Sequence, residues 1–176
     1  AYEKLAEMFL IACDWKKAEH YALKSKDFNQ QNLKADQVLM IAYRKMGQMN
    51  KAKAVIDSLL DDLPLYHLAR FEDLLLGTFN EANKNSFASL IRSPICELSF
   101  ETFMEMAEWY ETVGCKDEAL ILFSFIDDYP IANYKRAWLL YEKGNISESL
   151  EMLDRANELS PEYIFPFRSS TIKVLE

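Results

Sequence analysis

The sequence has 176 residues, and its balance of 50% hydrophobic and 27% charged residues is typical of a folded protein and excludes a disordered one. Asp and Glu number 28 against 20 Lys and Arg, and the net charge of −8 argues against a nucleic-acid surface or an anionic membrane as the partner. Four glycines and five prolines leave little room for linkers, so one domain or one short array is expected.

No alternating strand pattern of useful length is present, and apolar residues instead recur at the spacing of an amphipathic helix. In the first half this spacing predicts a helix that starts near Tyr2, one that ends near Phe28, and helices over 33–45, 50–62, 65–76 and 81–91. Pro64 is expected to end one helix, and a proline at this position can sit in the first turn of the next.

In the second half, a helix is predicted with Ser99 as its N-cap, followed by three more, of which the last stops at Ser160-Pro161. A final helix is predicted over 167–176. The stripes of the two helices before Ser160 place Tyr141 and Leu150 among the inward residues.

A short motif marks the turn inside each predicted helix pair: a small turn residue followed five positions later by alanine, once by serine. Its copies are Cys13 with Ala18, Gly47 with Ala52, Gly77 with Ala82, Gly114 with Ala119, and Gly144 with Ser149. A glycine after a helix can take the left-handed conformation, and a small residue one turn later lets two antiparallel helices approach closely. The turn residues are 34, 30, 37 and 30 positions apart, and such periods indicate a helical solenoid.

A longer period of 67 residues separates Gly47 from Gly114 and Gly77 from Gly144. Repeats two and three therefore look like a tandem copy of repeats four and five. The pairs Asp61-Asp62 and Asp127-Asp128 belong to this duplication. Adjacent helical residues point about 100° apart, so solvated helix ends are a better interpretation of these pairs than acid–base catalysis.

The best-preserved motifs are Leu5-Ala6, Phe9, Ala18 and Ala22 in the first repeat, Leu39-Met40, Tyr43, Gly47, Ala52, Ile56 and Pro64 in the second, and Met106-Ala107, Tyr110, Gly114, Ala119 and Phe123 in the fourth. The pattern resembles the tetratricopeptide repeat. The resemblance implies an all-α, right-handed α-solenoid of about five helix–turn–helix repeats plus a terminal helix. The expected single array over 1–176 has repeats near 2–31, 32–64, 65–94, 99–130 and 131–161, and a terminal helix over 162–176.

In tetratricopeptide arrays, the concave face lined by the first helix of each pair usually binds the partner. By matching positions, the resemblance implies a partner-binding face that includes Lys34, Gln37, Arg44, Glu101, Met104 and Glu108, with Ile41 and Glu111 beside them. Gln37 and Ile41 occupy key places of the Lys/Asn clamp that grips peptide C-termini, so a chaperone-type adaptor is not expected.

Motifs for catalysis or cofactor binding are missing: no glycine-rich phosphate loop, His-Glu-x-x-His, Cys-x-x-Cys or nucleophile elbow occurs. His20 and His67 have no second histidine or cysteine at metal-ligand spacing. Cys13, Cys96 and Cys115 are odd in number and are interpreted as small packing residues. No catalytic residue, metal or cofactor is therefore expected.

The function expected from this pattern is a non-catalytic protein- or peptide-binding scaffold, a segment of a larger polypeptide whose two ends look like cuts. Neither nucleic-acid binding nor membrane insertion is expected, self-association through the array ends stays open, and the compartment is open with the cytoplasm favoured. The alternative is an accessory repeat segment of a carbohydrate-active enzyme. Its basis is the ending 160–168, which is similar to one after repeats in large bacterial proteins with a mutarotase-like β-sandwich, and the stripe Tyr134-Trp138-Tyr141 would then stack on sugar.

Overall fold

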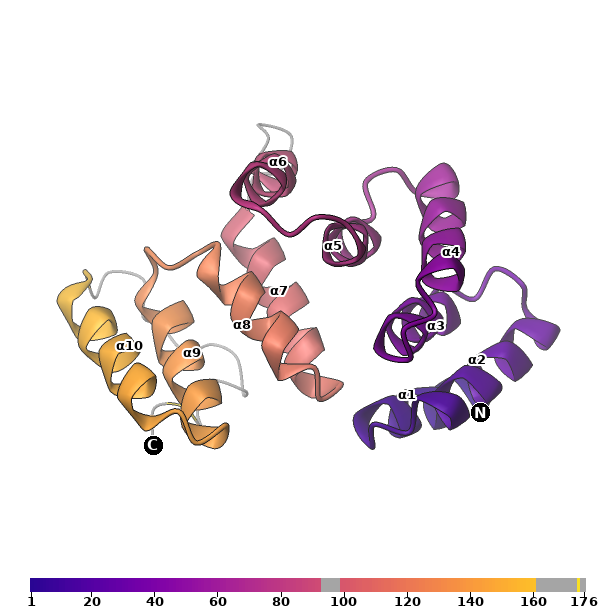
Figure 1. The fold of residues 1–176 in the computed structure, drawn as a ribbon, viewed down its shortest axis with the longest axis horizontal. Coiled ribbons are helices and arrows are strands. Elements are labelled where there is room, and N and C mark those ends of the chain that lie inside the picture. Colours follow the sequence, from indigo (N-terminus) through magenta and orange to yellow (C-terminus); the bar gives the residue numbers. More distant parts are fainter. Residues whose placement is uncertain (93–98, 161–173, 175–176) are drawn as a thin grey trace. The chain divides into compact units, whose positions relative to one another are not determined.

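The computed structural model describes residues 1–92, 99–160 and 174. Within these residues every regular element is an α-helix, and the helices follow one another as pairs (Figure 1). They are α1 (Tyr2–Ile11), α2 (Trp15–Phe28), α3 (Leu33–Lys45), α4 (Met49–Asp62), α5 (His67–Leu76), α6 (Glu81–Ile91), α7 (Ser99–Thr112), α8 (Lys116–Ser124), α9 (Pro130–Glu142) and α10 (Ile146–Glu158). The all-α repeat fold predicted from the apolar spacing is confirmed.

Most predicted boundaries agree with the structure, and α5 is the exception. The predicted start of α5 is wrong, because the helix begins two residues later, at His67. Pro64 instead lies in a turn, in which the Tyr66 amide donates to the Leu63 carbonyl at 3.0 Å. The Pro64 carbonyl also accepts a hydrogen bond from Arg70 Nε at 2.6 Å, which holds the turn against the helix.

The chain divides into two compact units, Ala1–Glu97 and Leu98–Glu176, and each is described by itself. The division falls between the predicted third and fourth repeats, and one continuous array over 1–176 stays a prediction. Several predicted features lie outside the described residues, namely the end of the third repeat near 94, the helix stop at Pro161, Cys96, and the terminal helix over 162–176 apart from Val174.

In the first unit, helices adjacent in sequence pack together from α1 to α6, and the first helices α1, α3 and α5 also contact one another in order. Such nearest-neighbour packing is how a helical repeat array buries its core. Side chains from all six helices form that core, among them Leu10, Ala22, Ile41, Ile56, Phe71 and Ile91.

In the second unit, α7 packs on α8, α8 on α9 and α9 on α10, around a core that includes Phe103, Tyr110, Leu122, Phe123 and Leu139. The predicted inward positions of Tyr141 and Leu150 are wrong, since these side chains are 59% and 55% exposed. The buried positions of α10 are Ser149 and Ala156 instead.

The two units differ in charge. Ala1–Glu97 contains 13 Lys and Arg and 13 Asp and Glu, whereas Leu98–Glu176 contains 7 and 15. The whole net charge of −8 therefore belongs to the second unit. A partner attracted by charge alone would meet a neutral surface on the first unit and an acidic one on the second.

Four of the five turns within helix pairs share one conformation, which the repeated motif predicts. Each has one residue in the left-handed region: Cys13 (φ 56°), Gly47 (φ 73°), Gly114 (φ 79°) and Gly144 (φ 82°). The next amide donates to the carbonyl five positions earlier, as Gln48 does to Tyr43 at 2.8 Å and Asn145 does to Leu140 at 2.9 Å. These bonds close the helix ends in the manner of a Schellman motif.

The same four turns bring the paired helices close together. The small residue five positions after each turn residue is buried: Ala18, Ala52 and Ala119 are 0% exposed and Ser149 is 5% exposed. The Ser149 hydroxyl donates to the Ala137 carbonyl of the partner helix at 2.8 Å. Cys115 is buried as predicted, but Cys13 is exposed, because it occupies the left-handed turn itself.

Candidate partner-binding site

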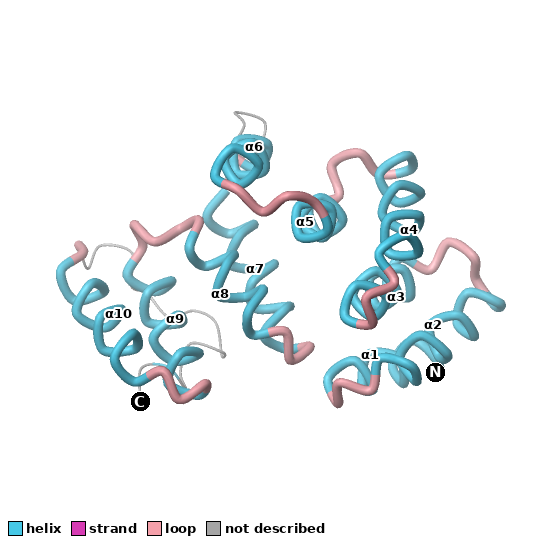
Figure 2. Tube along the Cα trace, in the orientation of Figure 1, coloured by secondary structure: helices cyan, strands magenta, loops and turns pink. Residues whose placement is uncertain are grey.

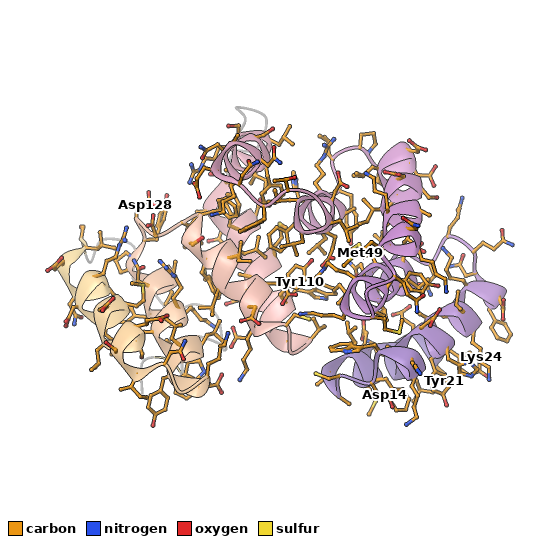
Figure 3. All side chains as sticks on the ribbon, viewed as in Figure 1. Asp14, Tyr21, Lys24, Met49, Tyr110 and Asp128 are labelled. Atoms are coloured by element: carbon orange, nitrogen blue, oxygen red, sulfur yellow. The ribbon has the colours of Figure 1, made fainter. Side chains whose placement is uncertain are left out.

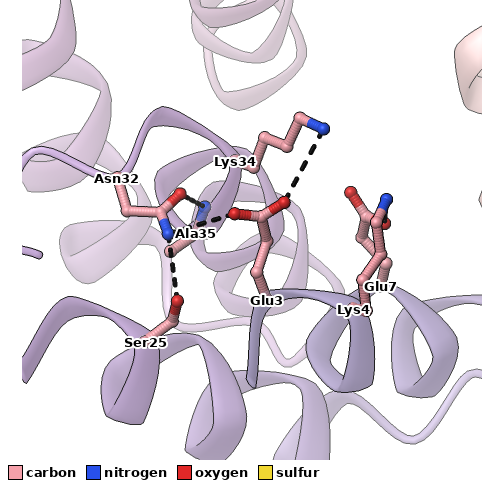
Figure 4. Close-up of polar contacts among 7 residues, drawn as sticks. All are labelled: Glu3, Lys4, Glu7, Ser25, Asn32, Lys34 and Ala35. Carbon is pink, nitrogen blue, oxygen red and sulfur yellow. Dashed lines mark hydrogen bonds and ion pairs between the residues drawn. The ribbon is translucent and has the colours of Figure 1, made fainter. Parts of the chain in front are cut away.

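The six predicted binding residues fall three in each unit, and in the first unit they contact neighbouring first helices. Lys34 at the start of α3 lies 3.6 Å from Glu3 of α1, and its side chain is 54% exposed. Asn32 Nδ2 donates to the same Glu3 carboxylate at 3.2 Å and to Ser25 Oγ at 3.0 Å (Figure 4). Its Oδ1 accepts from the Ala35 amide, which caps α3.

Two polar contacts of α3 reach forward to the next repeat. Gln37 Nε2 donates to the Tyr66 hydroxyl just before α5. Arg44 donates two hydrogen bonds to the Glu72 carboxylate of α5, from Nε to Oε2 at 2.5 Å and from Nη2 to Oε1 at 3.0 Å. The Arg44 side chain is 12% exposed and that of Glu72 is 0% exposed, so this bidentate pair is part of the repeat interface.

In the second unit, the predicted residues of α7 are also largely engaged. Met104 is 2% exposed and belongs to the core. Glu108 lies 3.6 Å and Glu111 lies 3.4 Å from the ammonium group of Lys135 on α9, a lysine whose side chain is 0% exposed. Glu101 is half-buried near the start of α7.

Most of the first-helix residues predicted for partner binding are therefore engaged with residues of neighbouring helices or with the core. Sequence matching places them on the first helices correctly, but it does not distinguish a charge that meets a partner from one that meets the next repeat. A signal exists, since Arg44 and Glu72 are opposite charges 28 positions apart, close to one repeat length. Their role in binding a partner stays a prediction.

The third turn, between α5 and α6, departs from the other four. Gly77 has φ −83° and ψ −162°, outside the left-handed region, and its amide donates to the Asp73 carbonyl in the α-helical manner. Four residues separate α5 from α6, whereas three separate the helices at every other turn within a pair. Figure 2 shows this connection as a drawn-out loop between α5 and α6.

Asn80 accounts for the longer turn. Its side chain accepts from the Asn83 amide at 2.9 Å and so caps α6, while Asn83 Nδ2 donates back to the Thr78 carbonyl at 2.7 Å. Asparagine is among the strongest N-cap residues. Helix α6 therefore begins two residues later, relative to its turn glycine, than the second helix of each other pair.

This shift turns the small residue of the motif away from the helix crossing. Ala52 is the fourth residue of α4 and is buried, whereas Ala82 is only the second residue of α6 and is exposed. Two residues correspond to a rotation of about 200° around a helix. The α5–α6 pair therefore lacks the close approach that the motif predicts for it.

A groove of about 620 Å³ opens beside this turn, and we name it the α4–α6 groove. Its walls and floor come from the faces of three helices: Met49, Asn50 and Lys53 of α4, Arg70, Asp73, Leu74 and Leu76 of α5 with Gly77, and Asn83, Ser86, Phe87 and Leu90 of α6. Its volume lies in the range of protein ligand sites. Sequence reasoning missed this groove, because it treated the third turn as a copy of the others.

Two rims of the groove are apolar and open to solvent. Met49, labelled in Figure 3, is 50% exposed at the start of α4, and Leu90 is 45% exposed on α6. Leu74 and Phe87 lie beneath them at 8% and 4% exposed. The Phe87 ring packs against Phe71 of α5 with centroids 5.6 Å apart, which fixes the floor.

A smaller hollow of about 500 Å³ lies between the start of α3 and the far end of α4, with Gln30, Leu33, Val55 and Leu59 among its lining residues. Lys26 and Asp36 also line it, but they form an ion pair with each other. The charges of this hollow are therefore largely matched within the chain.

Burial shifts the pKa values of two titratable groups near α5, Tyr66 and His67. Burial raises the pKa of Tyr66 to about 12, against the effect of the hydrogen bond from Gln37. Burial, and less strongly the Arg70 guanidinium, lowers the pKa of His67 below its ordinary value of 6.5. His67 Nδ1 is buried without a hydrogen-bond partner in the described part of the chain. A phenol that titrates near pH 12 does not act as an acid or base at neutral pH.

The aromatic stripe proposed for sugar stacking is mostly engaged in packing. Tyr134 donates its hydroxyl proton to Asn157 Oδ1 at 2.8 Å, and Trp138 contacts Tyr141 with ring centroids 6.2 Å apart. Tyr134 and Trp138 are half-buried, and Tyr141 is the one ring of the three that is exposed. Packing within the chain therefore accounts for two of the three rings, Tyr134 and Trp138.

Two further features of the described residues bear on function. They contain no group of three or more His, Cys, Asp or Glu side chains placed to hold a metal ion. None of the described helices has the length and apolar character needed to cross a bilayer.

Comparison with known proteins gives a likeness at the level of structure. No protein-family model matches the chain, and no curated protein matches it. The chain is similar to the crystal structure of TTC0263, a thermophilic TPR protein of Thermus thermophilus, with a TM-score of 0.51 and 18% sequence identity over 99% of this chain and 97% of that one. At this identity the likeness establishes the fold alone: the chain has the tetratricopeptide-like helical repeat fold that its motifs predict.

Proposed function

We propose that the chain is a non-catalytic scaffold that binds a protein or a peptide, as a segment of a larger polypeptide. The observation that supports this most strongly is the tetratricopeptide-like arrangement of successive helix pairs. Such pairs hold each other through their neighbours and leave extended helix faces open to a partner. The fold does not determine which face binds the partner, because the side chains on each face do.

Among the six first-helix residues, Lys34 and Glu101 are the ones we propose as partner contacts. Lys34 is 54% exposed with one long ion pair, and Glu101 is partly exposed. The other four hold neighbouring helices or the core within their own unit, namely Gln37, Arg44, Met104 and Glu108.

The test is affinity capture from an extract of the source cells, followed by binding of the recovered protein in purified form. The bait variants are Lys34→Glu and Glu101→Lys, and the matched control is Lys16→Glu, a charge reversal at an exposed residue of α2. A partner that binds the wild-type chain and the control, but binds the two variants about tenfold more weakly, supports the proposal. Equal binding by all four proteins, or no partner at all, contradicts it.

A further inference from the structure

We propose that the α4–α6 groove binds a peptide segment of a partner protein in which a carboxylate side chain stands among apolar side chains, and that Arg70 binds the carboxylate. The inference rests on the proposed scaffold function and assigns it a second surface, built from α4, α5 and α6 rather than from the first helices. The occupant follows from the shape, the apolar rims and the one unmatched charge of the groove.

The apolar part of the groove fits leucine-like or aromatic side chains of a peptide. Met49 and Leu90 expose about half of their surface on different walls, above the buried Leu74 and Phe87. A volume of about 620 Å³ holds a few side chains and not a folded domain. The methionine side chain adapts its shape to different apolar partners. Met49 therefore suits a site that accepts apolar side chains of several shapes.

Arg70 is the cation that the groove does not neutralise. Lys53 lies 2.7 Å from Asp73 and 2.9 Å from Asp57, so this cation is already bound by two carboxylates. Arg70 forms no ion pair with a described residue, and its Nε donates to the Pro64 carbonyl at 2.6 Å. That bond fixes the guanidinium group and leaves its two terminal nitrogens to receive a carboxylate in bidentate fashion.

Uncharged polar groups on opposite walls complete the site. Asn50 of α4 and Ser86 of α6 line the groove, and neither side chain has a hydrogen-bond partner among the described residues. Their amide and hydroxyl groups can both donate and accept, which matches the alternating groups of a peptide backbone. Together with Arg70 they offer hydrogen bonds beside the apolar rims.

Charge complementarity decides the class of peptide. The groove-lining charges are Lys53, Arg70 and Asp73, which sum to one positive charge in a first unit that is neutral as a whole. A basic peptide would place its cation beside Arg70 and would find Asp73 already bound to Lys53. An acidic, partly apolar peptide meets no such conflict.

The experiment uses a phage-displayed library of random peptides, each about 12 residues long, as the probe and the whole chain as the bait. Selected peptides are then synthesised. For each one, a control peptide is made in which Gln replaces the acidic residue. Binding is measured for the wild type, for Arg70→Glu, for Ser86→Trp, which fills the groove without changing its charge, and for the control Lys16→Glu. Circular dichroism confirms that each variant is folded before binding is scored.

We expect the selected peptides to be enriched in one Asp or Glu next to apolar residues. Arg70→Glu, Ser86→Trp and the Gln peptides should each weaken binding by about tenfold or more, and Lys16→Glu should not. If Arg70→Glu does not fold, Ser86→Trp and the Gln peptides still decide the matter. Peptides without acidic enrichment, binding unaffected by Ser86→Trp, or no selection at all would overturn the proposal.

Two outcomes separate the groove from the proposed scaffold function. A wild-type chain that dimerises with rising concentration, and loses the dimer in Arg70→Glu, would show that a second copy fills the groove and would overturn the peptide assignment. A cellular partner that depends on Lys34 and Glu101 but ignores Ser86→Trp would leave the scaffold function standing and remove the groove from it.

Discussion

The third and fifth turns of this protein start from the same motif and reach different structures. Gly77 and Gly144 are 67 residues apart in the duplicated halves, as are Ala82 and Ser149. Gly144 is left-handed at φ 82°, and Ser149 is buried and hydrogen-bonded to the partner helix. Gly77 is extended, and Ala82 is exposed.

The difference teaches that the local N-cap, rather than the glycine, decides how the two helices of a pair meet. At the fifth turn the residue after the glycine, Asn145, precedes α10 directly. At the third turn Asn80 is the N-cap and accepts a hydrogen bond through its side chain. Helix α6 begins two residues later than the regular turns would place it. The regular turn yields packing, whereas the irregular turn opens the groove to which we assign binding.

The largest effect on stability is expected when the ion pair that holds α5 against α3 is broken. Arg44→Met leaves the fully buried Glu72 carboxylate without its bidentate partner and should lower the free energy of unfolding by about 3–5 kcal/mol. Urea unfolding followed by circular dichroism measures the loss. The double variant Arg44→Met/Glu72→Met should recover most of it, because neither charge of the pair then remains. A single variant as stable as the wild type would show that the pair does not anchor α5.

The next prediction compares the two kinds of turn directly. Ala52→Leu forces a larger side chain into a closely packed crossing and should cost about 1–3 kcal/mol. Ala82→Leu, at the equivalent motif position but exposed, should change stability by no more than about 0.5 kcal/mol. The same unfolding measurement serves both variants. Equal costs would erase the proposed difference between the turns.

A smaller effect is expected from the turn glycines. Gly47→Ala places a side chain at φ 73°, and should cost about 1 kcal/mol even though nothing lies within 4 Å of the new Cβ. Gly77→Ala should be neutral or stabilising by about 0.5 kcal/mol, because its φ suits alanine and the nearest atom, the Asp73 carbonyl oxygen, is 3.4 Å away. Thermal unfolding of the two variants checks the contrast, and a reversed order would refute it.

The smallest expected effect is on pH dependence. The folded chain holds the pKa of His67 below 6.5, so the unfolded chain binds the proton more readily. The stability that neutral His67 contributes is present above pH 6.5 and is lost as the pH falls below it. Unfolding at a series of pH values from about 7.5 to about 5.5 should show a shallower decline for His67→Gln than for the wild type. Parallel curves would contradict this assignment.

Much of the fold is predictable from sequence, because helix periodicity and the repeated turn motif are local and redundant. The bounds of α3 and α6 follow from their apolar stripes and flanking polar residues. The start of α5 is less predictable, since Pro64 is compatible both with a first helical turn and with the loop that Arg70 stabilises here.

The candidate site is less predictable than the fold. A charged residue of a first helix, such as Arg44, occupies the same position in the repeat motif whether it binds a partner protein or Glu72 of the next repeat. Only the three-dimensional contact shows which of the two it binds. The groove lies beside the turn at which α6 begins two residues late. Asn80, a strong N-cap residue three positions after Gly77, indicates in the sequence that α6 starts late. The spacing from Gly77 to Ala82 matches the other repeats, however, and predicts a regular turn instead.

The most direct test of the difference between the turns is the thiol reactivity of the two motif positions. Ala52→Cys and Ala82→Cys are each placed in a background where Cys13 has become Gly, Cys96 Ser and Cys115 Ala, and the rate of reaction with a soluble disulfide reagent is measured. We predict that the cysteine at position 82 reacts as fast as in the urea-unfolded chain, while that at position 52 reacts only after unfolding. Equal protection at both positions would contradict the account, because it would mean that the third turn packs like the others.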